Sequence, residues 1–136
     1  MENKNIEFIN SKTHTPACII IRAGYQPSQT SFITQPDISQ QVGFVVYPQG
    51  GVIKRHIHKM VDRHIRGNSE ALMVRQGRCE IDIFDQEHNL LATRELHTGD
   101  FVLMIFGGHG FRVLEPTILL EVKLGPYPGP QEKEIF

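Results

Sequence analysis

The chain has 136 residues, of which 40% are hydrophobic and 21% are charged, a composition that suits a single globular domain. Fourteen Lys and Arg against fifteen Asp and Glu give a net charge of −1 with no basic stripe, which argues against nucleic acid as a partner. No apolar run approaches ~18 residues, so we expect no membrane span.

The location of the protein is predicted from its first residues and its cysteines. The first thirty residues lack a charged region followed by an apolar one, so no signal peptide is expected. Cys18 and Cys79 lie far apart without a CxxC motif, which indicates reduced, buried thiols. We therefore expect a cytoplasmic protein.

Short runs of β-branched and aromatic residues separated by turn formers predict strands, and no segment shows the period of an amphipathic helix. In chain order, the predicted strands are residues 17–22, 42–47, 52–58, 70–76, 78–85, 90–96, 101–106, 111–115 and 117–124. A series of about nine short strands with regular turn signals predicts an all-β sandwich or barrel.

Three histidines and a glutamate are the candidate metal ligands. Because side chains alternate along a strand, His56 and His58 share one face of the predicted strand 52–58. Glu70 begins a following strand, and His109 lies among the glycines of FGGHGF, which allow a sharp turn. Three histidines and one carboxylate suit one divalent ion such as Mn, Fe, Ni, Cu or Zn.

The spacing of these residues resembles the cupin family. The first cupin motif is Gly, five residues, His-x-His, a short gap, Glu, six residues and Gly, and Gly50, His56, His58, Glu70 and Gly77 match every interval except the gap. That gap is usually three or four residues and here holds the eleven residues KMVDRHIRGNS.

The second cupin motif also has counterparts in this sequence. Gly99 opens it, and Gly107 and His109 close it, with Ile105 where proline is common. The ending EVKLGPY resembles that of small cupin metalloproteins of bacterial polysaccharide biosynthesis. The resemblance covers roughly residues 42–124.

The resemblance implies a fold and a set of roles. The fold is a double-stranded β-helix, or jelly-roll cupin barrel, over residues 1–136, with an N-terminal arm (1–40), a barrel core (about 42–124) and a tail (125–136). His56, His58, Glu70 and His109 take the ligand roles, and the long gap leaves Asp62 or His64 open as a substitute for Glu70. A homodimer paired through the outer sheet is implied as well.

The function that follows is a metalloprotein that binds a small-molecule ligand. The reaction expected from the resemblance is isomerase, epimerase or oxygenase chemistry on a small sugar or sugar derivative. Lys54, Arg63 and His64 are candidate substrate contacts near the barrel mouth. A non-catalytic binding module and a structural cupin without metal remain open alternatives, and loop 59–69 is either a lid or an added turn.

Overall fold

The structure is a computed structural model that describes residues 4–136, so the first three residues of the predicted N-terminal arm lie outside the described residues. The chain forms two compact units, one made of the chain up to Tyr25 with Asn68–Phe136, and the other of Gln26–Gly67. Among residues 4–136, no helix has the length and apolar character needed to traverse a bilayer.

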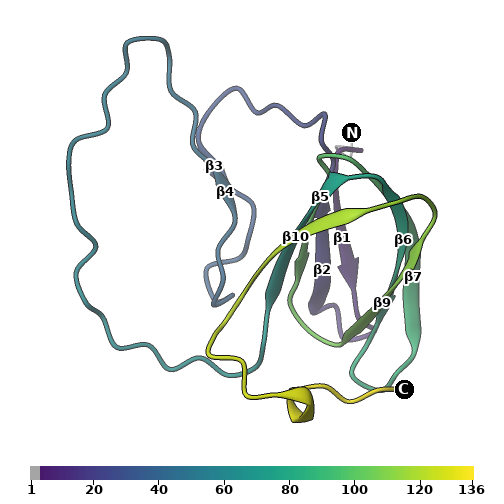
Figure 1. The fold of residues 1–136 in the computed structure, drawn as a ribbon. Coiled ribbons are helices and arrows are strands. Elements are labelled where there is room, and N and C mark those ends of the chain that lie inside the picture. The colour runs from purple at the N-terminus through teal and green to yellow at the C-terminus, as the bar shows by residue number, and fades with distance from the viewer. Residues whose placement is uncertain (1–3) are drawn as a thin grey trace. The chain divides into compact units, whose positions relative to one another are not determined.

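The first unit is built from antiparallel strands, as the sequence predicts (Figure 1). Its elements are β1 (Ile6–Asn10), β2 (Pro16–Ile21), β5 (Glu70–Gln76), β6 (Arg78–Phe84), β7 (Leu90–His97), β8 (Phe101–Met104), β9 (Gly108–Val113), β10 (Ile118–Lys123) and the short helix η1 (Pro130–Glu132). The all-β class is confirmed. The prediction for residues 70–76 matches β5 at both ends.

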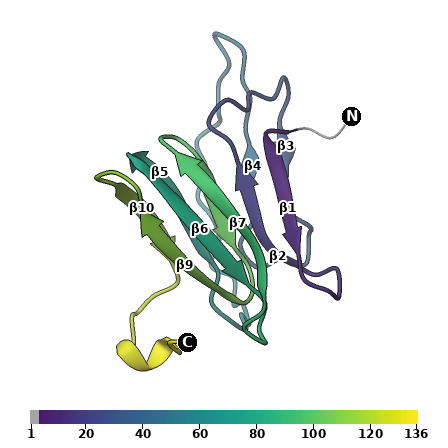
Figure 2. The same ribbon diagram turned by 90° about the vertical axis from the view of Figure 1, so that its right-hand side faces the viewer.

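The strands of this unit form two sheets, an arrangement consistent with a β-sandwich. One sheet has the order β1-β2-β8-β5-β10 and the other the order β7-β6-β9, and Figure 2 shows their strands running side by side. Within residues 4–136 neither sheet closes on itself. Consequently β10 ends one sheet and β9 ends the other, and each has an edge without a neighbouring strand.

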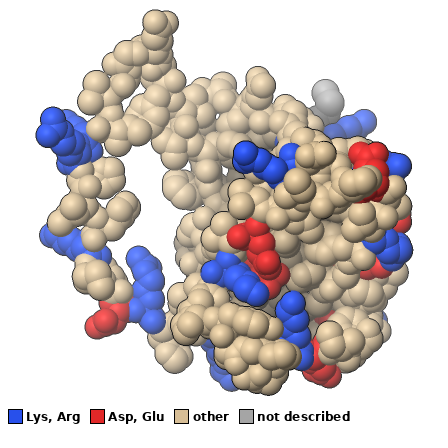
Figure 3. All heavy atoms as spheres, in the orientation of Figure 1, with Lys and Arg blue, Asp and Glu red and all other residues tan. Residues whose placement is uncertain are grey.

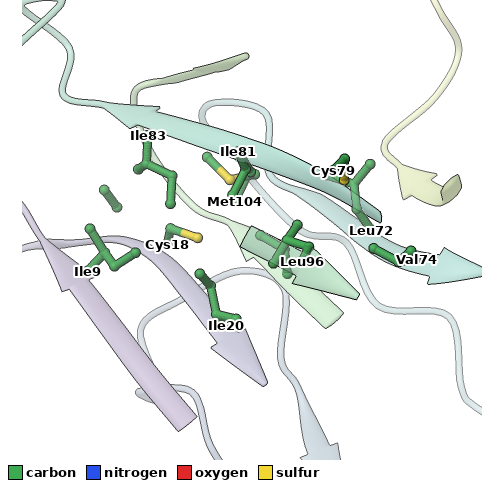
Figure 4. Close-up of a cluster of buried hydrophobic side chains, with 12 residues drawn as sticks. Ile9, Cys18, Ile20, Leu72, Val74, Cys79, Ile81, Ile83, Leu96 and Met104 are labelled. Carbon is green, nitrogen blue, oxygen red and sulfur yellow. The ribbon is translucent and has the colours of Figure 1, made fainter. Parts of the chain in front are cut away.

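Side-chain alternation explains the core between the sheets. In β6, Cys79, Ile81 and Ile83 are fully buried, while the residues between them are half-buried. They pack against residues of the other sheet that include Ile20 and Leu72 (Figure 4). Burial of each large aliphatic side chain contributes about 1.5–3 kcal/mol, so this interface holds the first unit together.

The opposite face of the five-stranded sheet is also apolar. The strand register places two rows of side chains across it, one running Phe8, Ile19, Leu103, Ala71, Val122 and the other Ile6, Ile21, Phe101, Met73, Leu120. Phe8, Leu120 and Val122 are 45%, 50% and 57% exposed. The middle of both rows is covered, since Ile19, Ile21 and Leu103 are buried, so the exposed apolar side chains lie at the two edge strands of this sheet.

Asp100 closes the turn between β7 and β8, where its amide donates to the carbonyl oxygen of His97 at 2.9 Å. It is only 4% exposed and accepts hydrogen bonds from the amides of Ala23 and His97 and from the guanidinium of Arg22, each at 2.9 Å. A buried carboxylate needs such partners to offset its lost hydration. Asp100 therefore ties the β7–β8 turn to the end of β2.

The second unit has little regular structure. β3 (Ser31–Phe32) pairs with β4 (Gly43–Phe44), so the predicted strand 42–47 shrinks to two residues. The predicted strand 52–58 is wrong for this structure, where residues 51–66 are extended and exposed without any ladder. A segment with alternating residues forms a strand only when a neighbouring backbone pairs with its N–H and C=O groups, and residues 51–66 have no such neighbour in the structure.

Candidate metal centre

The four predicted ligands form two pairs, one in each unit. Glu70 is the first residue of β5 and His109 the second residue of β9, and both belong to the first unit. His56 and His58 belong to the extended segment of the second unit. Within residues 4–136, no three His, Cys, Asp or Glu side chains gather closely enough to hold one ion.

Glu70 and His109 meet because both side chains point between the two sheets. Glu70 shares a face of β5 with the buried Leu72, and His109 lies opposite the buried Ile83. The Glu70 Oε2 atom lies 3.4 Å from His109 Nε2. Their side chains are 18% and 28% exposed, so the pair lies at the end of the sandwich within reach of solvent.

The position of His109 differs in part from the prediction. It lies within strand β9 rather than in a glycine turn, and only Gly107 has the positive φ (77°) of a sharp bend. A Cβ at Gly107 would collide with the carbonyl oxygen of Phe84. Gly107 therefore lets β9 begin beside the end of β6, which aims His109 at the sandwich interior.

Burial sets the charge state of this pair. It raises the pKa of the Glu70 carboxyl, and the neighbouring Glu121 raises that pKa further through its charge and a hydrogen bond. Burial also lowers the pKa of the His109 imidazole. His109 is therefore neutral near pH 7, which is the form that binds metals.

The separation of the two donor atoms fits one metal ion. With metal–ligand bonds of about 2.1 Å, ligands at a tetrahedral angle place their donor atoms roughly 3.4 Å apart. The observed 3.4 Å between Glu70 Oε2 and His109 Nε2 agrees with that value. The separation of Glu70 Oε2 and His109 Nε2 is therefore compatible with both atoms binding one ion.

His56 and His58 form a second pair with suitable geometry, although not on a strand. Their ring centroids are 5.2 Å apart. The Nδ1 atom of His56 lies 2.8 Å from the carbonyl oxygen of Lys54, so Nδ1 carries the proton and donates it. Such a hydrogen bond leaves the lone pair of Nε2 available to bind a metal, as is usual for metal-binding histidines.

The remaining predicted site residues all lie in the extended segment. Lys54, Asp62, Arg63 and His64 are exposed there. Figure 3 shows basic side chains spaced along this segment, and Asp62 is its sole acidic residue between positions 51 and 67. These residues belong to the second unit, and the Glu70–His109 pair belongs to the first.

Two charged residues of the site went unrecognised in the sequence. Glu121 lies opposite Leu72 in the β10–β5 pairing, and Lys123 lies opposite Glu70. Both side chains therefore share the face of Glu70, and Lys123 lowers the pKa that burial and Glu121 raise. The sequence shows that Glu121 and Lys123 share a face of their strand, but it does not show that this strand pairs with β5 so that they face the same side as Glu70.

Comparisons of the chain with protein-family models, with curated proteins and with solved structures find no match. The resemblance to cupins therefore depends on the motif residues themselves. Of these, Glu70 and His109 come together in the structure, and Gly50, Gly77, Gly99 and Gly107 all have positive φ.

Proposed function

We propose that this protein is a cupin-type metalloprotein in which His56, His58, Glu70 and His109 bind one divalent transition metal. The observation that carries the proposal is the 3.4 Å separation of Glu70 Oε2 and His109 Nε2, two side chains that lie 39 residues apart in sequence (109 − 70). The free Nε2 of His56 supports it.

The proposal includes closure of the sandwich into a jelly roll. β9 and β10 each have an open edge, and segments 52–58 and 42–47 have the alternation and β-branched content of strands. Adjacent strands lie about 4.8 Å apart, so segment 52–58 paired along β9 would place its histidine face next to His109. Strand addition at this edge would complete the ligand set.

A bound ion of this kind supplies Lewis acidity to a carbonyl or hydroxyl oxygen of a ligand. Glu70 would bind in its ionised form, and the ion would offset the repulsion between Glu70 and Glu121. The ligand class that we propose is a small sugar or sugar derivative, supported by the likeness of the stretch EVKLGPY (121–127) to small cupin metalloproteins of polysaccharide biosynthesis. Its hydroxyl groups are natural partners for a metal with open positions.

Elemental analysis of protein purified without chelator and without a polyhistidine tag tests the proposal. We expect about one divalent ion per chain in the parent, because one set of four ligands holds one ion. The His56→Ala and His109→Ala variants should each lose it. His97→Ala is the matched control, since His97 is a 60% exposed surface histidine, and this variant should retain the ion.

Two further variants identify the carboxylate ligand. Loss of the ion in Glu70→Gln but not in Asp62→Asn or His64→Ala would assign the position to Glu70. If the parent holds no metal even after incubation with Mn, Fe, Ni and Zn, the metalloprotein proposal fails. The barrel would then be a ligand-binding or structural module.

A further inference from the structure

The segment that follows β10 packs against the end of the sandwich that holds Glu70 and His109. Figure 1 shows it running along the lower end of the first unit, where β5 and β9 begin. It passes through η1 and brings Phe136 to the end of β6. There the Phe136 ring lies edge-on to Phe84, with ring centroids 5.0 Å apart and an interplanar angle of 87°.

The same ring stacks on a histidine of the β6–β7 turn. Phe136 and His88 lie 4.0 Å apart with an interplanar angle of 6°. Glu134 adds a long contact, with its Oε1 atom 3.9 Å from His88 Nε2. Phe84 and His88 therefore both contact the Phe136 ring, and Glu134 of the same segment contacts His88.

A glycine next to His109 makes room for this ring. A Cβ added at Gly108 would lie 2.9 Å from the Cε1 and Cζ atoms of Phe136, which is closer than real side chains approach. Gly108 directly precedes His109 in β9. Because side chains alternate along β9, the Gly108 position faces away from the sandwich interior, so the Phe136 ring lies on the outer face of the three-stranded sheet. The segment leaves β10 at Lys123, opposite Glu70 in the five-stranded sheet, and therefore crosses the end of the sandwich that holds Glu70 and His109 before it reaches this outer face.

The segment is held by few contacts. Phe136 remains 56% exposed and Ile135 88% exposed. The amides of Glu132 and Lys133 donate to carbonyl groups of the segment itself, at 3.2 and 3.1 Å. An aromatic contact of this kind increases the population of the state in which Phe136 packs on Phe84 and His88, relative to the detached state, by about two- to tenfold.

We propose that Gly129–Phe136 is a lid on the end of the sandwich that contains Glu70 and His109, with Phe136 as its latch. When the ring leaves its seat between Phe84, His88 and Gly108, the segment opens and admits a ligand to the pair. The role as a lid on a metal site rests on the proposed function, whereas the latch itself does not.

The rate at which diethyl pyrocarbonate modifies His109 in metal-free protein, followed by peptide mass mapping, tests the latch. In Phe136→Ala we expect modification of His109 to accelerate by about two- to tenfold, because that factor is the docking preference being removed. His88 should accelerate as well. Ile135→Ala is the matched control and should behave as the parent.

Two comparisons separate the latch from a general loss of structure. Phe136→Tyr keeps the ring and should keep the slow rate of the parent. His97 reports on the fold itself, and its rate should be the same in all four proteins because it is far along the chain from the segment and already 60% exposed. Equal His109 rates in Phe136→Ala and the parent would overturn the latch.

The readout distinguishes this proposal from the metal site. Modification of His109 needs no metal, so a parent without metal but with accelerated modification in Phe136→Ala would refute the site and keep the latch. A parent with metal and an unaltered rate in Phe136→Ala would refute the latch and keep the site.

Discussion

Replacement of Gly77 by alanine tests whether the motif glycines serve the backbone or the site. Gly77 joins β5 to β6 with a φ of 103°, a conformation that costs an L-residue about 1–2 kcal/mol. A Cβ at this position would collide with the carbonyl oxygen of Pro116 and would lie 2.7 Å from Thr117 Oγ1 and 2.8 Å from Thr117 Cα. Backbone atoms cannot move aside as a flexible side chain can.

The strain and the collision together should lower the free energy of unfolding by roughly 2–4 kcal/mol, after about 0.4–1 kcal/mol is returned by the stiffer unfolded chain. Urea unfolding followed by circular dichroism measures the change. Gly110→Ala is the control, since no atom lies within 4 Å of its added Cβ, and it should stay within about 1 kcal/mol of the parent. Equal midpoints for the two variants would refute the reasoning.

Burial and charge at Cys18, Leu120 and Glu7 each have a measurable consequence. Burial raises the pKa of the Cys18 thiol to about 12, so a thiol reagent at pH 8 should leave Cys18 unmodified until the protein unfolds. The exposed apolar side chains of the edge strand β10, Leu120 and Val122, predict a homodimer, and Leu120→Glu should convert it to a monomer in sedimentation equilibrium; a parent that is already monomeric would contradict this. The guanidinium of Arg94 hydrogen-bonds to the Glu7 carboxylate and lowers its pKa. The Arg94–Glu7 ion pair therefore stabilises the fold at pH values above the pKa of an unfolded glutamate, and this stabilisation is lost as the pH falls through the lowered pKa of Glu7. Glu7→Gln should therefore cost about 0.5–1 kcal/mol at pH 7 and nothing in strong acid, as measured by urea unfolding.

The strands that sequence predicts best are those with one buried face. Residues 78–84 alternate between buried and half-buried positions, so the pattern of apolar residues is the pattern of contacts. β1 escapes prediction because it is an edge strand in which only Ile9 is fully buried. Segment 52–58 shows the converse case, since its alternation is clear but it has no paired neighbour.

The candidate site was predictable only where local spacing determines it. The motif placed Glu70 at the start of a strand and His109 after a glycine bend, and the structure brings the two together. Glu121 could not be assigned, because a bulge between Ile118 and Leu119 shifts the register that places it near Glu70. The seat of Phe136 joins residues that no spacing rule connects, so it becomes visible only in three dimensions.

Metal binding should order segment 52–58, and this prediction joins the site to the fold. In the structure the amides of this segment have no ladder partners, so without added metal we expect them to exchange with solvent within seconds. An ion held by ligands from both units would bind only the paired state. It would therefore stabilise that state by about 2.7 kcal/mol at a free concentration of 100 times its dissociation constant.

Hydrogen exchange read by mass spectrometry, with and without Zn²⁺, measures this ordering. We expect amides of segment 52–58 and of the open edge of β9 to slow by roughly a hundredfold at that concentration, because 2.7 kcal/mol corresponds to that factor. His58→Ala should remove the protection and leave exchange in β6 unchanged, since β6 already has neighbours on both sides. Binding of Zn²⁺ with no slowing of segment 52–58 would mean that the ion is held within one unit, and strand closure would have to be abandoned while metal binding stood.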